Sequence, residues 1–480
     1  MELYHADLVV IGGGAAGMPA ALEALEQGVR RVVLMDKRPF PGGNARMAGG
    51  FVFACDAYTH KKAGVTLHAE DVYRHTMAFH HYDGINPRVL WAFIARSADN
   101  LDWLRSKGIE YEYNPIMGNG IVGAGAPGSY ARVLDRLRAE FLEKGGILLT
   151  DTPAKELLLD PSGRICGVLG RHKARGEIRV ETPYVFLATG GFMGDEALMQ
   201  KYFADQYDPA AYATDALKLT GDGIHMAERA GALLAPKATL AKESGFSFVH
   251  HNAPHRISMY EGALWVNQDG VRFCDESTAA EHINANLLVM QPGMYGYSIM
   301  DEGMMQDLIQ HPSPRINNEF LQPGDPKVKT QLQQLAHQLP DQCLIADSLE
   351  QIAAWLGAPP DIFLHTVSTY NAACAAGYDG EFFKPAAQLK PLTTPPYYVC
   401  RFSPLMIETI GPVMINHHFQ VLRASDRQPL PGLYAGGAVT SGWQGHDYEL
   451  WGANLGYGLS SGRIAADHIA ASLREAQRRK

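Results

Sequence analysis

The stretch Leu8-Val9-Val10-Ile11-Gly12-Gly13-Gly14-Ala15-Ala16-Gly17 decides the fold of this chain. Its first four residues are an apolar run of the kind that forms a buried strand. The next six fit G-x-G-x-x-G, and residues 18–27 are helix-forming up to Gly28, a favourable residue for ending a helix. A second apolar run, 32–35, ends at Asp36. The order strand, glycine turn, helix, strand, acid predicts a βαβ unit that binds a dinucleotide.

Each residue type in this unit has its own task in the predicted site. Gly12 permits the tight turn, Gly14 lets a pyrophosphate approach the backbone, and Gly17 lets helix and strand pack closely. The predicted helix begins at about residue 18, so its N-terminus faces the phosphates. Asp36 lies about twenty residues past the last glycine, where an acid binds the ribose and favours a free 2′-hydroxyl.

Composition excludes several classes of protein. The chain has 480 residues, 46% of them hydrophobic and 19% charged, with 42 basic and 51 acidic side chains. It is too apolar to be disordered and has no basic stripe for nucleic acid. Six scattered cysteines without a C-x-x-C pair suit a cytoplasmic protein with reduced thiols. No signal peptide, membrane span or metal site is expected.

Further glycine-rich turns indicate a cofactor longer than one nucleotide. One follows Asp36 in residues 37–50, a second ends the apolar run 184–191, and a third ends the run 432–439. Because glycine lets a ligand approach the backbone closely, turns spread through the chain predict a long cofactor that lies along extended backbone.

These segments resemble the FAD-binding domain of the fumarate reductase and succinate dehydrogenase flavoproteins, a family that includes the 3-ketosteroid dehydrogenases. The resemblance covers nearly the whole chain, including residues 220–223, 269–273 and 432–469. It implies an α/β fold with a Rossmann-like FAD-binding domain built from residues 1–235 and 390–480. An α+β capping domain of residues 236–389 would be inserted between these two parts.

The resemblance also implies which residues hold the FAD. Residues 44–50 contain no histidine that could attach a flavin, so noncovalent binding is expected. Ala438 stands where relatives often carry Glu or Asn, so one hydrogen bond to the cofactor is lost. The implied contacts are Gly12, Gly14, Ala16, Gly17, Asp36, Lys37, Gly43, Asn44, Gly49, Gly50, Ala154, Thr189, Gly190, Asp222, Gly437, Ala438, Ala453, Asn454 and Leu455.

Three departures from the family's pattern argue against fumarate reduction. Fumarate reductases carry a proton-delivering arginine eight positions after the arginine of G-x-R-F, and Ala280 stands at that position here. Their H-T-M-G-G segment corresponds to residues 408–412, which begin with Glu408. Their G-A-N-R-L-G-G-N segment is missing. We therefore expect that the dicarboxylate chemistry has been lost, since fold does not fix function.

The stretch 445–456 is similar to the G-H-x-Y-x-x-x-G-A-x-x-G of the 3-ketosteroid dehydrogenases. In that branch a tyrosine hydroxyl and a glycine N–H hold the ketone oxygen of the substrate, and they correspond to Tyr448 and Gly452. Two such hydrogen bonds stabilise the enolate that forms when the Cα proton leaves. The resemblance therefore implies desaturation of the Cα–Cβ bond next to a ketone, with hydride passing from Cβ to flavin N5.

The catalytic base stays open, because the tyrosine of that branch again corresponds to Ala280. Tyr113 lies where the relatives carry a second active-site tyrosine, and His282 has a suitable ordinary pKa. Tyr130 and Glu281 are further candidates.

Two other functions stay in view beside the desaturation of a cyclic ketone or 3-ketosteroid. One is reduction of an enone or unsaturated acid, for which Arg256 and His250 would have to hold a carboxylate. The other is a non-catalytic FAD-binding protein. Because haem and iron–sulfur motifs are absent from the sequence, electrons would pass to or from a separate partner. The sequence leaves the oligomeric state undetermined.

Overall fold

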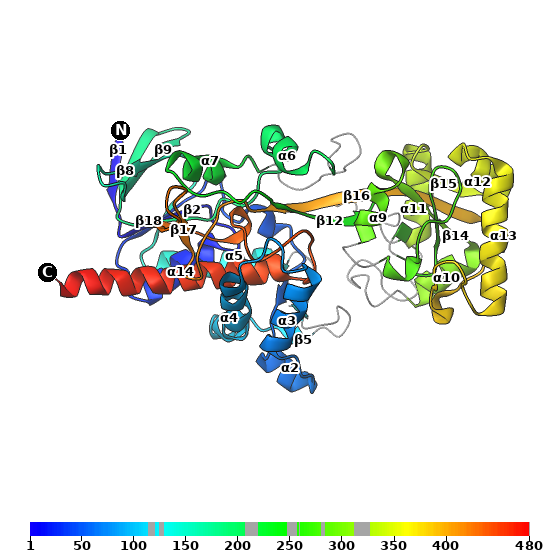
Figure 1. The fold of residues 1–480 in the computed structure, drawn as a ribbon, viewed down its shortest axis with the longest axis horizontal. Helices are drawn as coiled ribbons and strands as arrows, with labels where there is room; N and C mark the ends of the chain where they lie inside the picture. The colour runs from blue at the N-terminus through cyan, green and yellow to red at the C-terminus, as the bar shows by residue number, and fades with distance from the viewer. Residues whose placement is uncertain are drawn as a thin grey trace. The chain divides into compact units, whose positions relative to one another are not determined.

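The computed structural model describes residues 1–113, 121–123, 129–206, 219–246, 257–258, 260–279, 284–311 and 327–479. The chain forms two compact units (Figure 1). Unit 1 comprises Met1–Phe203, Leu217–Leu240 and Glu408–Lys480, and unit 2 comprises Ala204–Ala216 and Ala241–Ile407. The units change over near residues 240 and 407 on the long strands β12 (Thr239–Gly245) and β16 (Tyr397–Ile410). The domain boundaries at 235 and 390 stay a prediction.

A six-stranded sheet lies at the centre of unit 1, in the order β17-β18-β11-β2-β3-β7. The pairs β18–β11, β11–β2, β2–β3 and β3–β7 are parallel, and every residue of β2 and β3 is buried. Burial on both faces explains why these strands are continuous apolar runs. The strands are β17 (Gln420–Leu422), β18 (Pro429–Ala435), β11 (Val185–Leu187), β2 (Leu8–Ile11), β3 (Val32–Met35) and β7 (Ile147–Leu149).

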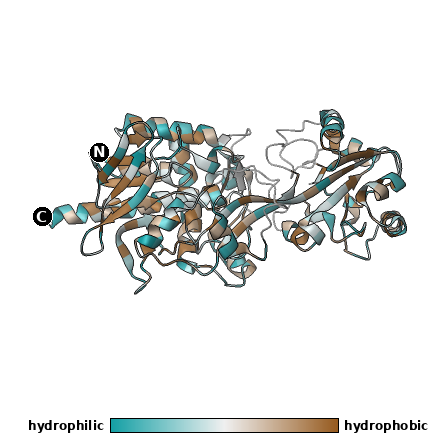
Figure 2. Cartoon of the chain, turned by 90° about the horizontal axis from the view of Figure 1, so that it is seen from above, coloured by the Kyte–Doolittle hydropathy of each residue, from teal (hydrophilic) through white to brown (hydrophobic). Residues whose placement is uncertain are grey.

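Helix α1 (Gly17–Glu26) follows β2 and packs against α14 (Ala453–Arg478), the red helix that ends the chain in Figure 1. Glycine makes this contact close, because a Cβ at Gly462 would lie 2.2 Å from the Ala16 carbonyl oxygen. The last turns of α14 are exposed and largely hydrophilic (Figure 2). The predicted Rossmann-like fold is therefore confirmed, with strand, glycine turn, helix and strand in the expected order.

Two smaller sheets and several helices complete unit 1. The sheets run β1-β10-β9-β8 and β4-β6-β5. Their strands are β1 (Glu2–His5), β10 (Gly176–Glu181), β9 (Ile165–His172), β8 (Ala154–Leu159), β4 (Phe51–Phe53), β6 (Ile121–Gly123) and β5 (Glu112–Tyr113). The helices are α2 (Tyr58–Ala63), α3 (Ala69–Phe79), α4 (Pro87–Ser106), α5 (Ser129–Glu143), α6 (Glu196–Phe203) and α7 (Asp222–Arg229).

Unit 2 is the expected α+β unit, with a sheet in the order β12-β16-β14-β13 and β15 paired to β16. A buried ion-pair cluster joins two of its sequence motifs, because Arg272 Nη2 lies 2.8 Å from both Glu276 Oε2 and Asp379 Oδ2. The remaining strands are β13 (Leu264–Val266), β14 (Gly296–Met300) and β15 (Cys343–Ala346). The helices are α9 (Ala285–Val289), α10 (Glu302–Gln310), α11 (Lys327–Gln338), α12 (Leu349–Leu356) and α13 (Pro360–Ala376).

Within the described ranges, every helix falls short of the length or apolar character that crossing a membrane would require.

Candidate cofactor and substrate site

The turn after β2 is built from close backbone approaches that only glycine allows. Gly12 has φ +97°, and a Cβ there would lie 2.3 Å from the Ala188 carbonyl oxygen. A Cβ at Gly17 would lie 1.8 Å from the Gly12 carbonyl oxygen. At Gly14 the nearest protein atom to a Cβ would be Gly42 O, 3.6 Å away, so the protein itself does not require glycine there. Gly12 and Gly17 therefore serve the fold, and Gly14 leaves space for a ligand.

Asp36 and Lys37 follow β3 and tie neighbouring segments together. Asp36 Oδ2 accepts a hydrogen bond of 2.9 Å from the Gly13 N–H, and burial raises the pKa of its carboxyl. Lys37 Nζ donates to Asp222 Oδ2 and to Thr220 Oγ1, each at 2.8 Å. The structure thus brings together three of the predicted cofactor residues, Asp36, Lys37 and Asp222, with the glycine turn and the start of α7.

Buried polar atoms without a partner mark where a polar ligand fits. Among the described residues, the Asn44 amide, Thr189 Oγ1 and Asn454 Oδ1 are buried and make no hydrogen bond within the protein. All three residues belong to the set that the sequence predicted to hold FAD. Burying such atoms unpaired is costly, and a cofactor rich in donors and acceptors would satisfy them. Together with the space at Gly14, they fit an FAD.

Two helix N-termini meet at the same place. α1 begins after Ala16 and α14 after Gly452, and neither has a side-chain cap. A Cβ at Gly458, in the second turn of α14, would lie 2.8 Å from the Ala15 Cβ, so α14 packs against the glycine turn that leads into α1. Free N–H groups at a helix N-terminus favour anionic ligands such as phosphate or a developing oxyanion.

The other predicted cofactor residues lie in turns or at element ends. Gly43 and Gly50 have positive φ in the stretch between β3 and β4, as does Gly190 after β11. Gly437 donates its N–H to Ser461 Oγ at 3.0 Å, and the Ala438 carbonyl accepts from Gly411 N–H at 2.8 Å. The remaining predicted residues are Gly49 next to β4, Ala154 at the start of β8, and Ala453 and Leu455 in the first turn of α14.

Tyr448 lies on the loop of residues 441–452 that leads into α14. Burial raises the pKa of its hydroxyl, while the N–H groups of Asn454, Gly452 and Ala453 oppose that rise. Gly452 has φ +73°, and its carbonyl accepts the Phe53 N–H of β4 at 3.1 Å. The structure therefore brings Tyr448 and Gly452, the predicted oxygen-binding pair, to the N-terminus of α14.

Glu408 lies near the end of β16, where a Cβ at Gly190 would be 4.0 Å from its Oε1. The sequence indicated it only as the residue that stands in place of a histidine of the fumarate reductases. Its neighbour Thr409 packs on the turn after β11, where Thr409 Oγ1 accepts the Phe192 N–H at 2.6 Å. Burial raises the pKa of Glu408 to about 7, and a hydrogen bond from the Gly191 N–H opposes the rise. The negative charge of Glu408 in turn contributes to the raised pKa of Tyr448.

A second buried carboxyl, Glu449, joins the same loop to α3. Its Oε1 lies 2.8 Å from His75 Nε2, and its Oε2 lies 3.7 Å from His80 Nε2. Burial raises the pKa of Glu449 to about 7 and lowers the pKa of His80 to about 4. Sequence reasoning missed this cluster, because two histidines about 370 residues earlier in the chain give no signal that they meet Glu449.

Of the candidates for the catalytic base, Tyr113 and Tyr130 lie among the described residues. Tyr113 ends β5, and its ring meets the His60 ring edge-on at 5.3 Å. Tyr130 is fully buried in α5. His282 and Glu281 lie outside the described residues, as do Ala280, His250 and Arg256.

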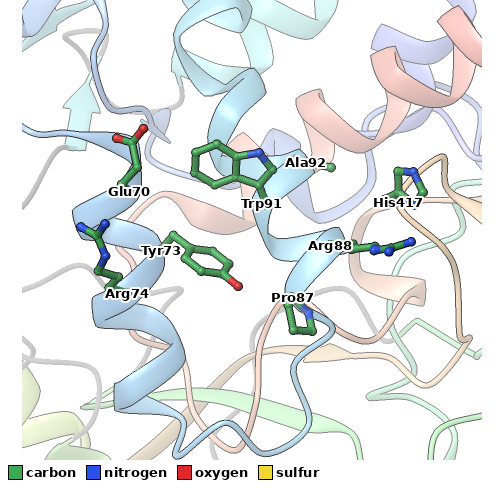
Figure 3. A pocket seen from close by; sticks show the side chains of 8 residues that line it. All are labelled: Glu70, Tyr73, Arg74, Pro87, Arg88, Trp91, Ala92 and His417. Atoms are coloured by element: carbon green, nitrogen blue, oxygen red, sulfur yellow. The ribbon is translucent and has the colours of Figure 1, made fainter.

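A separate hollow of about 530 Å³ lies between α3 and α4 (Figure 3). The Tyr73 and Trp91 rings meet there at 5.8 Å and nearly at right angles. The remaining lining residues are Glu70, Arg74, Pro87, Arg88, Ala92 and His417. Since no predicted cofactor or substrate residue lines it, this hollow is distinct from the site around Tyr448.

Comparisons with known proteins agree with this geometry. A family model described as an FAD binding domain matches residues 7–455. The chain is 30% identical to the vinyl phenol reductase of Lactiplantibacillus plantarum, over 97% of this chain and 96% of that protein. It is 28% identical to a fumarate reductase (cytochrome) of Shewanella frigidimarina, over 97% of this chain and 77% of that protein. The fold matches a 3-ketosteroid Δ1-dehydrogenase structure from Sterolibacterium denitrificans, with a TM-score of 0.78, 19% identity and coverage of 98% and 100%.

Proposed function

The chain belongs to the family of FAD-binding flavoproteins that includes fumarate reductases, and we propose that its substrate is a cyclic ketone, enone or phenol. The protein is an FAD-dependent oxidoreductase. In this proposal the Tyr448 hydroxyl and the Gly452 N–H hold the substrate oxygen, and hydride is exchanged at the conjugated carbon–carbon bond. FAD, when bound at the glycine turns, supplies the hydride chemistry, and a separate electron carrier completes the cycle.

The pair of donors at the start of α14 carries the proposal. Hydride addition to the β-carbon of an enone leaves negative charge on the oxygen, and removal of a Cα proton from a ketone does the same. A buried hydroxyl and a helix N-terminal N–H both stabilise that charge, and one such donor is worth roughly 3 kcal/mol in the transition state. The same two groups therefore serve reduction and desaturation.

The charges around Tyr448 favour a neutral oxygen over a carboxylate. Glu408 raises the pKa of Tyr448, which means that negative charge beside the hydroxyl is already unfavourable there. A dicarboxylate would add to this repulsion, whereas a ketone or phenol brings no charge. The name of one relative supports the same class, because a vinyl phenol has its alkene conjugated with a ring oxygen. The names of both curated relatives support the reductive direction.

A test of the proposal follows flavin absorbance without oxygen. The holoprotein is reduced with dithionite and mixed with 2-cyclohexenone, 4-vinylphenol, a steroid dienone or fumarate, and reoxidation is timed by stopped flow. We expect reoxidation by an oxygen-conjugated alkene and none by fumarate. Tyr448→Phe should slow the reaction about 100-fold, because one oxyanion donor is lost.

The matched control is Tyr457→Phe, which also removes a buried tyrosine hydroxyl. That hydroxyl lies 2.7 Å from Thr440 Oγ1, inside the packing of α14, so its loss should leave the reoxidation rate within a few-fold of the wild-type rate. Reoxidation by fumarate alone, or a Tyr448→Phe variant as fast as wild type on every enone, would overturn the proposal.

A further inference from the structure

We propose that Cys343 and Cys400 form a reversible disulfide bond in unit 2 when the protein meets a small disulfide oxidant such as glutathione disulfide. Both cysteines lie in the sheet of unit 2, and both are free thiols in the structure. The inference is independent of the function proposed above, because neither cysteine is a predicted cofactor or substrate residue. The bond makes the stability of unit 2 depend on redox conditions.

Strand pairing places the two cysteines directly opposite each other. Cys343 begins β15 and is the antiparallel partner of Cys400 in β16. Because directly opposed residues point their side chains to the same face of a sheet, the two thiols lie on one face. Cys343 is 1% exposed and Cys400 is 0% exposed, and both belong to the hydrophobic core of unit 2.

The hydrogen bonds around the two cysteines show which kind of antiparallel pair they form. In the adjacent pair of residues, the Arg401 N–H donates to the Gln342 carbonyl at 2.8 Å, so this is a hydrogen-bonded pair. The two kinds of pair alternate along an antiparallel ladder, and Cys343 and Cys400 therefore form a non-hydrogen-bonded pair. In agreement, the Cys343 N–H donates at 3.0 Å to the Leu339 carbonyl, which precedes β15.

A non-hydrogen-bonded pair suits a disulfide bond. Its Cα atoms lie about 4.5 Å apart, and its side chains are closer than those of a hydrogen-bonded pair. A disulfide needs Cα atoms roughly 4.4–6.8 Å apart and Cβ atoms roughly 3.5–4.5 Å apart, so the bond requires little movement of the backbone. Burial raises the pKa of the Cys400 thiol, and a hydrogen bond with the Cys343 thiol adds to that rise.

The position of β15 at the edge of the sheet gives an oxidant access to the buried pair. Among the described strands, β15 pairs with β16 alone, and its two middle residues, Leu344 and Ile345, are partly exposed. A short edge strand opens more readily than the centre of a sheet, and each opening exposes Cys343 to a small oxidant. Because the thiols are buried between openings, we expect oxidation to take hours.

The reaction is a thiol–disulfide exchange in two steps. Cys343, deprotonated in the open state, attacks one sulfur of glutathione disulfide, and one glutathione leaves as a thiolate. When β15 pairs again, the Cys400 sulfur attacks the Cys343 sulfur of this mixed disulfide, and its proton passes to the second glutathione as that leaves. The two cysteines thus lose two electrons and two protons, and one glutathione disulfide becomes two glutathione thiols.

The test identifies the linked residues directly. The holoprotein is incubated with glutathione disulfide for several hours, the remaining thiols are alkylated, and the digested protein is analysed by mass spectrometry. We expect a peptide that links Cys343 to Cys400 and an intact protein that is lighter by two hydrogen atoms. Dithiothreitol should reverse both changes. The control thiol is Cys274, which is also buried in unit 2 and should still be alkylated.

Thermal unfolding gives a second readout. A cross-link removes freedom from the unfolded chain, and the segment between the two cysteines contains α12 and α13. The oxidised protein should therefore unfold a few degrees above the reduced protein. Cys343→Val and Cys400→Val each keep an apolar, strand-forming side chain. Both variants should unfold close to the temperature of the reduced wild type, with or without the oxidant.

Several results would overturn the proposal. If Cys343 and Cys400 are both recovered as alkylated thiols, or if Cys343 stays bound to glutathione, the two sulfurs cannot reach each other. A peptide that links either residue to a different cysteine would assign the bond to another pair. If the oxidant raises the unfolding temperature of Cys400→Val as much as that of wild type, the stabilisation does not come from this bond.

Discussion

The two ends of unit 1 contribute to its predicted site in different ways. At the amino-terminal end, the turn from Gly12 to Gly17 is fixed by contacts with its own backbone and with the backbone of Ala188, which follows the neighbouring parallel strand β11. At the carboxyl-terminal end, the loop of residues 441–452 depends on side chains from distant segments, Glu408 on β16 and His75 on α3. The glycines of the sequence therefore predict where the cofactor binds. The surroundings of the predicted substrate-binding residues cannot be predicted in this way, because they include side chains that only folding brings together.

The largest expected effect is at the glycine turn. Gly17→Ala would place a Cβ 1.8 Å from the Gly12 carbonyl oxygen, so the turn must shift and the start of α1 with it. We expect this variant to lose both FAD and several kcal/mol of folding stability, as strained core substitutions do. Thermal unfolding and the absorbance ratio of flavin to protein measure the two losses.

Gly14→Ala is the matched variant, because its Cβ meets only Gly42 O, at 3.6 Å. The cofactor-free protein should therefore unfold at the wild-type temperature, within a degree or two, while FAD affinity falls at least 10-fold. Equal FAD affinity in Gly14→Ala and wild type would show that Gly14 does not face the cofactor, and the assignment of the turn would fail.

The difference between the glycine turn and the loop of residues 441–452 also explains which parts of the fold and site the sequence can predict. The βαβ unit was predictable because G-x-G-x-x-G between two buried apolar runs reports local geometry. The pairing of Tyr448 with the N-terminus of α14 was also predictable, since Gly452 stands only four positions after Tyr448. The Glu449 cluster was not, because His75 and His80 are brought to it only when α3 packs beside the loop.

The next effect concerns stability around Glu449 and His80, whose pKa shifts oppose each other. The pKa of Glu449 rises from 4.5 to about 7 on folding, so the folded state binds more protons and stability falls as the pH rises between these values. The pKa of His80 falls from 6.5 to about 4, so the unfolded state binds more protons and stability increases over that range. In wild type the two slopes largely cancel between pH 4.5 and pH 6.5.

Each single variant should expose one slope. Glu449→Gln leaves His80, so the free energy of unfolding should increase from pH 4.5 to pH 6.5, by about 3 kcal/mol at most. His80→Gln leaves Glu449, so in this variant the free energy of unfolding should decrease by a similar amount over the same pH range. Denaturant unfolding at several pH values measures both, with the difference from wild type isolating the site. If the free energy of unfolding depended on pH in the same way in both variants, the opposite pKa shifts of Glu449 and His80 would be wrong.

The smallest expected effect concerns Lys37. It tests whether Lys37 contacts the FAD directly or only holds Asp222 and Thr220 in place. Its Nζ is shared between Asp222 and Thr220, with about a third of the Lys37 side chain exposed. If Lys37 acts through this ion pair, Lys37→Met and Asp222→Asn should each lower the stability of the cofactor-free protein by less than about 1 kcal/mol. The double variant should cost no more than either single one, since both remove the same interaction. FAD affinity should then change little in all three variants.

A fall in FAD affinity for Lys37→Met, with stability unchanged and additive losses in the double variant, would instead show that the Lys37 ammonium contacts the cofactor directly.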